Sequence, residues 1–458
     1  MERCGCDRRR SVPVLLLLSL LLFLLLPGCA GDSGEAETPP EPAEQSAEVN
    51  DDRTPISFWY AASGAGISAM EGILSDFNAA QSEYRAVPTV YGSYTDITHA
   101  VQDALATGNA PDLAVLESDV ALDLFQKGQI ADLTRLLRAD GLDPARFLPV
   151  YFDLSRTPDG QVFSVPFYGT TQVLYYNKAA FSSAGIEPGS IKTWQDLANA
   201  ARRIRDAGIC SYGWEPMWGY ENLLDAAFSN GARVFSPDGK TVTINSPEWI
   251  EVWEAFRGWL HSERIMRIHS GGVGWEYWYH TMDDALTGAA GGFTGSSGDQ
   301  ADVDFNLVGM LAQPAWTDGQ QASPEAKALL LSVLASESGH FDGACALLHY
   351  LVDVPAQVKW STQTGYIAAN RNVNDDPDYR AYLARNPYAT VPTEQSLHAS
   401  VYPPDPTGGA VREALRLAAD RVEIEGISAR DALDEAQRSA QRALDAALAQ
   451  RPAGEEKP

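Results

Sequence analysis

The residues of this sequence that could perform catalysis or hold a cofactor are its histidines, serines and glycine-rich turns. The seven histidines lack the i, i+4 spacing and the paired cysteines that a zinc site requires. In Gly295-Ser296-Ser297-Gly298, neither serine has glycine at both i−2 and i+2, as a nucleophile elbow needs. The turn Ser63-Gly64-Ala65-Gly66 lacks the third glycine of a dinucleotide-binding motif. We therefore expect no metal, no cofactor and no covalent catalysis.

Paired carboxylates leave one enzymatic alternative open. A glycosidase needs only two carboxyl groups about 5 to 9.5 Å apart, a spacing that a sequence does not reveal. Most acidic residues of this chain lie on predicted helix faces and in linkers, where carboxylates are usually solvated. The sequence therefore weighs against an exported glycosidase, which stays open as the enzymatic alternative.

Composition restricts the partners and the size of the fold. The chain has 458 residues, with 61 acidic against 34 basic side chains and a formal net charge of −27. Such an acidic surface repels the phosphates of nucleic acids, so we expect no nucleic-acid partner. About 400 residues after the N-terminal segment exceed what one hydrophobic core usually supports, so we expect two domains.

The N-terminal segment, residues 1–28, predicts an export signal. Four arginines precede the apolar run Val14–Leu26, which is too short for a stable membrane span of roughly 20 residues. The run ends in Leu26-Pro27-Gly28-Cys29, which resembles the lipobox of bacterial lipoproteins and implies lipidation of Cys29. Residues 29–53 are mainly Gly, Ser, Glu, Pro and Ala, a composition typical of a disordered acidic tether. We expect a protein anchored to the outer face of the cell membrane; the alternative is an ordinary secretory signal.

Strand and helix patterns alternate from Pro55 onward. The run Ile56–Tyr60 predicts a buried strand, and the next helix carries its apolar residues on one face. The same order repeats with strands at residues 85–91 and Asp112–Leu116. Strand–helix–strand units of this kind indicate an α/β fold with a largely parallel sheet.

A second set of elements starts near Phe167. Gln172–Tyr176 predicts a strand, and Thr193-Trp194-Gln195-Asp196 is a capping box that opens a helix. The last part of the chain is predicted to be helical, and residues 451–458 form a flexible tail.

Several stretches, in this order, resemble one known family. They are Phe58-Trp59, Thr107-Gly108-Asn109-Ala110-Pro111-Asp112, Val165-Pro166-Phe167-Tyr168-Gly169-Thr170-Thr171, Leu174-Tyr175-Tyr176-Asn177-Lys178, Thr193-Trp194-Gln195-Asp196-Leu197 and Thr364-Gly365-Tyr366. Together they resemble the extracellular solute-binding proteins of ABC importers, in the carbohydrate-type branch with the maltose-binding and sn-glycerol-3-phosphate-binding proteins. The resemblance implies a monomeric receptor that captures a sugar or polyol and delivers it to the ABC permease subunits.

The family fold implied is the two-lobe, type II-like periplasmic-binding-protein fold, with a ligand cleft between lobes joined by a multi-segment hinge. By analogy, lobe 1 comprises residues 54–169 and 300–322, and lobe 2 comprises residues 170–299 and 323–450. The first crossing between the lobes is then expected near Tyr168–Thr171, and the return near Gly298–Asp302.

The resemblance also implies which residues face the cleft. They are Tyr94, Glu117, Tyr168, Thr170, Trp214, Trp218, Tyr220, Trp275, Ser297 and Tyr366. The aromatic members suit the apolar face of a pyranose, and a carboxylate such as Glu117 suits a vicinal diol.

Two departures from the glycerol-phosphate-binding branch bear on the ligand. That branch uses a glycine pair where this chain has Ala326-Lys327, and a loop arginine where this chain has Pro404, with Arg412 the nearest base. Without a bidentate guanidinium, a phosphate loses its preferred partner. The sequence therefore favours a neutral sugar or polyol; a glycerol-3-phosphate or glycerophosphodiester receptor of the same fold is the alternative.

Overall fold

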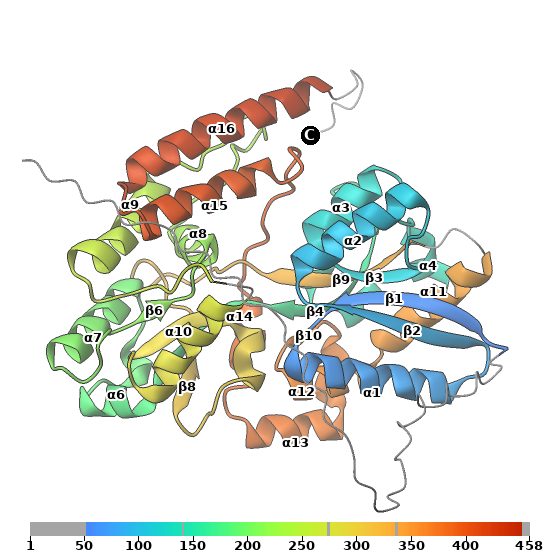
Figure 1. The fold of residues 1–458 in the computed structure, drawn as a ribbon, viewed down its shortest axis with the longest axis horizontal. Helices are drawn as coiled ribbons and strands as arrows, with labels where there is room; N and C mark the ends of the chain where they lie inside the picture. Colours follow the sequence, from blue (N-terminus) through green and yellow to red (C-terminus); the bar gives the residue numbers. More distant parts are fainter. Residues whose placement is uncertain (1–51, 140–141, 273–274, 335–337, 451–458) are drawn as a thin grey trace, which may run out of the picture. The chain divides into compact units, whose positions relative to one another are not determined.

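The computed structural model describes residues 52–139, 142–272, 275–334 and 338–450. These residues form two β-sheets, each packed against its own helices (Figure 1). The predicted export signal, Cys29 and the predicted tail at residues 451–458 lie outside the described residues.

The first sheet has six strands in the order β10-β4-β9-β3-β1-β2. Strand β1 is parallel to β2 and β3, whereas β9 is antiparallel to both β3 and β4. The strands are β1 Thr54–Ala61, β2 Tyr84–Tyr91, β3 Leu113–Glu117, β4 Val165–Thr170, β9 Lys327–Val333 and β10 Ile367–Ala368.

Helices cover both faces of this sheet. Ile56, Phe58 and Tyr60 of β1 share a buried core with α1, α11 and α12, while Ala114 and Leu116 of β3 share another with α2 and α3. Those helices are α1 Gly64–Ala80, α2 Tyr94–Thr107, α3 Ser118–Gln126, α11 Ser338–Leu351 and α12 Val354–Thr364. Coverage on both sides explains why the strands are nearly continuous in apolar residues.

The second sheet has four strands in the order β6-β7-β5-β8. Strand β5 is antiparallel to β7 and β8, and the short β6 is parallel to β7. The strands are β5 Gln172–Asn177, β6 Glu215–Pro216, β7 Gly292–Ser296 and β8 Val308–Leu311.

The second sheet and the helices packed on it form what we call the second part of the chain. Its larger core lies on one face of β5. Leu174 packs there with helices α7, α9, α15 and α16, whereas Val173 and Tyr175 pack on the other face with α10. The capping box at Thr193 and Asp196 is present and opens α7, as predicted. The helices are α7 Trp194–Asp206, α8 Tyr220–Ser229, α9 Pro247–Arg257, α10 Glu276–Thr287, α15 Ala410–Glu423 and α16 Ala429–Gln450.

Shorter helices complete the described chain. They are α4 Thr134–Ala139, α5 Pro149–Asp153, α6 Lys178–Ser183, α13 Pro377–Arg385 and α14 Val391–Ser396.

Strand pairing corrects the expected lobe boundaries. The chain passes from β4 to β5 at Thr171, within the region predicted for the first crossing. Residues 300–322 were expected in lobe 1. However, they contain β8, which hydrogen-bonds to β5 and so belongs to the second sheet. Residues 323–450 were expected in lobe 2, but β9 lies between β3 and β4 in the first sheet.

The return to the first sheet therefore lies between Leu311 and Lys327, not near Gly298–Asp302. A third crossing lies between β10, in the first sheet, and α15, in the core of the second part. The chain thus passes between the two sheets more than once, as a multi-segment hinge requires.

Two further features concern the membrane and the cysteines. Among the described residues, no helix is both long and apolar enough to cross a membrane. Cys210 packs in the larger core of the second part, while Cys345 is buried on α11, so the two do not form a disulfide with each other.

Candidate functional site

A cavity of about 820 Å³ lies where strand ends of both sheets meet. Its lining includes the last residues of β3, β4 and β7 (Glu117, Thr170 and Ser296) and Lys327, the first residue of the antiparallel β9. In open α/β sheets, ligands bind outside the carboxyl ends of the strands, because the loops that follow converge there. The cavity is therefore the candidate site of this fold.

Glu117 is the carboxylate at the first sheet's end of the cavity. It ends β3 opposite Leu329 of β9, and α3 begins at the next residue, so the backbone turns and leaves the carboxylate facing the cavity. Burial, together with the nearby charge of Asp119, raises the pKa of Glu117 to about 7. Near neutral pH this group can therefore both donate and accept hydrogen bonds.

Three tyrosines form the floor beside Glu117. The hydroxyl groups of Tyr94 and Tyr168 lie 3.2 Å apart, and the rings of Tyr168 and Tyr366 have centroids 4.5 Å apart. Tyr366 also lies close to Gly298, where a Cβ would approach its ring to 2.3 Å. Trp360 stacks on Tyr366 and packs at a tilt against Tyr168, which holds the phenols in place.

An aromatic wall faces the cavity from the second part. Trp218 donates its indole N–H to Asp420 Oδ1 at 2.9 Å and meets Tyr277 edge to face, with ring centroids 5.1 Å apart. Trp275 is 41% exposed and donates to the Gly92 carbonyl at 3.3 Å. Both tryptophans line the cavity, with Tyr277 and Trp278 of α10. Rings fixed in this way present flat apolar faces at low entropic cost.

Three cations line the cavity, each paired with an acid, and Arg156 is paired with its neighbour Asp153. Lys327 Nζ lies 3.0 Å from Glu221 Oε1, and Arg412 donates to Glu325 Oε1 at 2.7 Å and to the Tyr220 hydroxyl at 2.9 Å. Burial favours a higher pKa for Glu221, but the charge of Lys327 and its hydrogen bond outweigh burial and lower it.

The guanidinium of Arg412 lies over the Tyr402 ring, 3.6 Å from its centroid. Although burial opposes charge on this group, the Glu325 carboxylate raises the pKa of Arg412 well above its ordinary value. Arg412 is therefore held charged at the cavity, which corrects the expectation that no guanidinium reaches the site.

Eight of the ten residues predicted for the site line the cavity. They are Tyr94, Glu117, Tyr168, Thr170, Trp218, Tyr220, Trp275 and Tyr366.

Trp214 and Ser297 were predicted for the site but do not line the cavity. Trp214 is fully buried in the larger core of the second part, where its indole N–H donates to Thr294 Oγ1 at 2.9 Å. Ser297 is fully buried and lies 3.0 Å from Thr170 Oγ1, so it supports the threonine from behind. Ser296, 2.7 Å from the same hydroxyl, is the serine that lines the cavity.

Asp299 and Asp302 are cavity residues that sequence reasoning missed. They lie in and directly after the 3-10 turn Ser297–Ala301, which follows β7. Burial raises the pKa of Asp299 to about 8, and the Asp302 charge adds to that rise. No strand was predicted for Gly292–Ser296, so the signal that indicated Glu117, a position at the end of a predicted strand, was missing here. One group of described side chains that could hold a metal ion, Glu215, His269 and Asp284, does not line the cavity.

A family model connects this geometry with known proteins. The model for bacterial extracellular solute-binding proteins matches residues 72–387, most of the chain. The chain belongs to this family. It is therefore a solute-binding receptor of the ABC-importer class and not an enzyme, so the glycosidase alternative is wrong.

Relatives and solved structures agree with the assignment. The sn-glycerol-3-phosphate-binding periplasmic protein UgpB of Escherichia coli (strain K12) is 28% identical over 359 residues, which cover 75% of this chain and 81% of UgpB. The GacH receptor of Streptomyces glaucescens and UgpB from Mycobacterium tuberculosis each align with a TM-score of 0.75 and 19% identity, over 86% of this chain and 99% of theirs. These structures confirm the α/β periplasmic-binding-protein fold.

Proposed function

We propose that this receptor captures a neutral sugar or polyol in the cavity and delivers it to an ABC permease. The observation that carries the proposal is the charge balance of the cavity: nine of its lining residues are acidic and three are basic. Even with Glu117 and Asp299 protonated, the seven other acids outnumber the three bases. The three cations, Arg156, Lys327 and Arg412, are all engaged by carboxylates. A phosphate entering this cavity would meet a surplus of negative charge and three cations that already have partners.

The remaining surface suits a polyhydroxylated ligand. Hydroxyl, carboxyl and carboxylate groups supply donors and acceptors for sugar hydroxyls, and Glu117 can supply either because its pKa lies near 7. Trp218 and Trp275 supply apolar faces for the C–H side of a sugar ring. GacH, of the same fold, was solved in complex with acarbose, and UgpB from Mycobacterium tuberculosis in complex with glycerophosphocholine.

A glycerophosphodiester is the second candidate. Arg412 and Lys327 lie in the same cavity, so a guanidinium and an ammonium could both reach one phosphate if their carboxylate partners yielded. The curated relatives named for sn-glycerol-3-phosphate favour this candidate. The pairing of both cations weighs against it.

Delivery follows from a ligand that bridges the two parts of the chain. A sugar that contacts Glu117 and Tyr94 from the first sheet and Trp218 and Tyr277 from the second part shifts the receptor towards its closed form. We further propose that lipidation at Cys29 keeps the receptor near its permease, which raises their effective concentration.

A thermal-shift screen tests the proposal. The protein is heated with mono- and oligosaccharides, glycerol 3-phosphate and glycerophosphocholine at equal concentrations. Bound ligand raises the melting temperature by mass action. We expect the largest shift from a neutral sugar; a larger shift from either phosphate compound would overturn the proposal in favour of the second candidate.

A further inference from the structure

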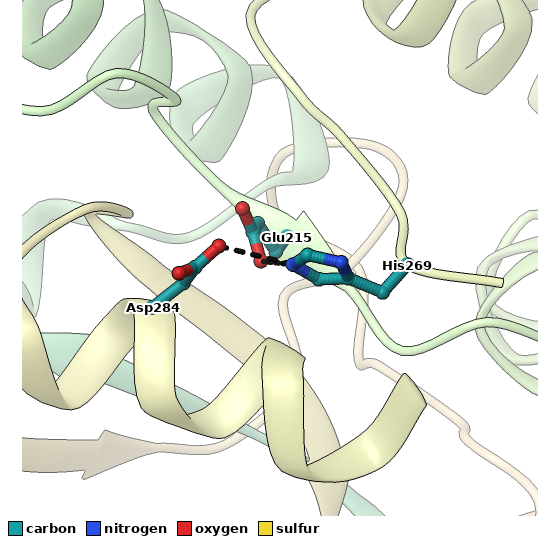
Figure 2. Close-up of side chains that lie close together, drawn as sticks. All are labelled: Glu215, His269 and Asp284. Atoms are coloured by element: carbon teal, nitrogen blue, oxygen red, sulfur yellow. Dashed lines mark hydrogen bonds and ion pairs between the residues drawn. The ribbon is translucent and has the colours of Figure 1, made fainter. Parts of the chain in front are cut away.

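A cluster of three potential metal ligands lies outside the ligand cavity (Figure 2). Glu215 comes from the short strand β6, His269 from the irregular segment that precedes α10, and Asp284 from α10 itself. Figure 2 shows the imidazole pointing at both carboxylates, with one atom of each side chain within 4.8 Å of the others. The three residues come from distant parts of the sequence, so the fold alone brings them together.

The distances between these atoms fit one metal ion. His269 Nε2 lies 3.0 Å from Asp284 Oδ2 and 3.6 Å from Glu215 Oε2. A tetrahedral Zn²⁺ with bonds of about 2.0 to 2.1 Å holds its ligand atoms roughly 3.3 Å apart. These two separations lie on either side of that value, and the third, between the two carboxylates, is at most 4.8 Å. An ion could bind between the three ligands once the Arg267 side chain, which contacts all of them, moves aside.

Among the described residues, Glu215 has a buried carboxylate oxygen without a hydrogen-bond partner, which points to a cation independently of the distances. Its side chain is fully buried, and its Oε2 atom, the one nearest His269, has no hydrogen-bond partner in the described structure. A buried carboxylate oxygen without a partner is costly, and a cation at this position would remove that cost.

Arg267 is the existing cation of the cluster and the competitor of any metal. It donates to Glu215 Oε1 at 2.6 Å, contacts Asp284 Oδ2, and lies 3.1 Å from His269 Nε2. Its guanidinium also lies over the Tyr212 ring, 4.1 Å from the centroid. The pairing with Oε1 and the ring leaves Oε2 of Glu215 available, so a metal would take Asp284 and His269 from Arg267 without displacing it entirely.

Imidazole in its neutral form is the metal-binding species. Imidazole nitrogen and carboxylate oxygen are both donors that Zn²⁺ accepts, and three such ligands leave the fourth tetrahedral position to water.

We propose that Glu215, His269 and Asp284 form a Zn²⁺ site that fixes one wall of the ligand cavity. Asp284 lies on α10, whose first turn carries the cavity residues Tyr277 and Trp278, and Glu215 lies two residues before the cavity residue Met217. A bound ion joins β6 to α10 and so connects both sides of this wall. The site is distinct from the solute site and does not depend on which solute binds.

Equilibrium dialysis of the full chain against Zn²⁺, with the bound metal measured by mass spectrometry, tests the proposal. We expect the wild type to bind one more equivalent of Zn²⁺ than the variants His269→Gln and Asp284→Asn. Each substitution should weaken binding at this site at least about tenfold. Every cysteine is common to these proteins, so zinc bound to thiols cancels in the comparison. His280→Gln is the matched control: its ring lies 5.4 Å from that of His269, and this exposed residue is not one of the ligands.

Two further results separate a site from a merely structural cluster. Zn²⁺ should raise the melting temperature of the wild type and of His280→Gln, but not of His269→Gln. Arg267→Gln, which removes the competing cation, should bind Zn²⁺ more tightly than the wild type. Equal Zn²⁺ binding by the wild type and by folded His269→Gln and Asp284→Asn would overturn the proposal, as would weaker binding by folded Arg267→Gln.

Discussion

Glu221→Gln gives the sharpest test of how the cavity excludes phosphate. The carboxylate of Glu221 lies 3.0 Å from Lys327 Nζ, and the two side chains are 29% and 32% exposed. At such partly exposed positions two charges about 4 Å apart attract by about 4 kcal/mol before screening, although hydrogen bonds to charged groups contribute only about 1.5 to 3 kcal/mol net. Glutamine keeps the size of the side chain and removes its charge.

The substitution should therefore make Lys327 available to an anionic ligand. We expect the affinity for glycerol 3-phosphate to rise about 10- to 100-fold, because each 1.4 kcal/mol corresponds to about a factor of ten. Calorimetric titration at pH 7.5 measures this, with Glu413→Gln as the control. Glu413 is an exposed acid on α15 that pairs with Arg416 outside the cavity, so its substitution changes the net charge equally. An unchanged or lower phosphate affinity in folded Glu221→Gln would refute the reasoning.

Three other predictions follow from the site and the sequence. Trp218→Ala should weaken sugar binding about 10- to 100-fold, because it removes about 1.5 to 3 kcal/mol of apolar contact. Calorimetry measures this effect, with Trp316→Ala, a substitution outside the cavity, as the control. Equal affinities of the two variants would show that Trp218 is not part of the site. The free energy of unfolding, measured by urea titration, should fall from pH 5 to pH 8. Glu117 and Asp299, with pKa values of about 7 and 8, hold protons in the folded state that the unfolded chain releases. A higher stability at pH 8 than at pH 5 would contradict this assignment. Cys29→Ser should move the protein from the membrane fraction to the medium or periplasm, as fractionation and immunoblotting would show; continued membrane association would argue against the anchor.

The sign of the pH effect rests on which state binds the proton. A raised pKa in the folded state means that stability is largest below the unfolded values, 4.5 for Glu and 3.8 for Asp, and is lost as the pH rises through 7 and 8. Carboxylates with lowered pKa values, such as Glu221 and Glu413, titrate below this window and do not oppose the trend.

Local pattern was sufficient to predict several elements of the fold. The apolar run Ile56–Tyr60 lies within β1, and the capping box at Thr193 opens α7 as predicted. Both features depend on residues close together in sequence. The assignment of β8 and β9 to sheets failed because each short strand is placed by its pairing partner, and sequence patterns do not name that partner.

The cavity residues also divide into those that a local pattern predicts and those that distant contacts place. Glu117 could be predicted because it directly follows an apolar strand and so lies at a carboxyl end. Trp214 and Trp218 differ by only four positions, yet one is core and the other cavity wall. Trp214 is held in the core by its contact with Gly292, where any Cβ would meet the indole ring at 2.4 Å. Arg412 reaches the cavity through Glu325 and Tyr220, partners more than 80 residues away, which no local pattern could indicate.

The most direct test of the central claim is a calorimetric titration of the wild-type receptor with its best neutral sugar and, separately, with glycerol 3-phosphate and glycerophosphocholine. The surplus of acids around Lys327 and Arg412 predicts that the sugar binds at least about tenfold more tightly than either phosphate compound. Tighter binding of glycerol 3-phosphate or glycerophosphocholine would contradict the claim that this cavity is built for a neutral carbohydrate.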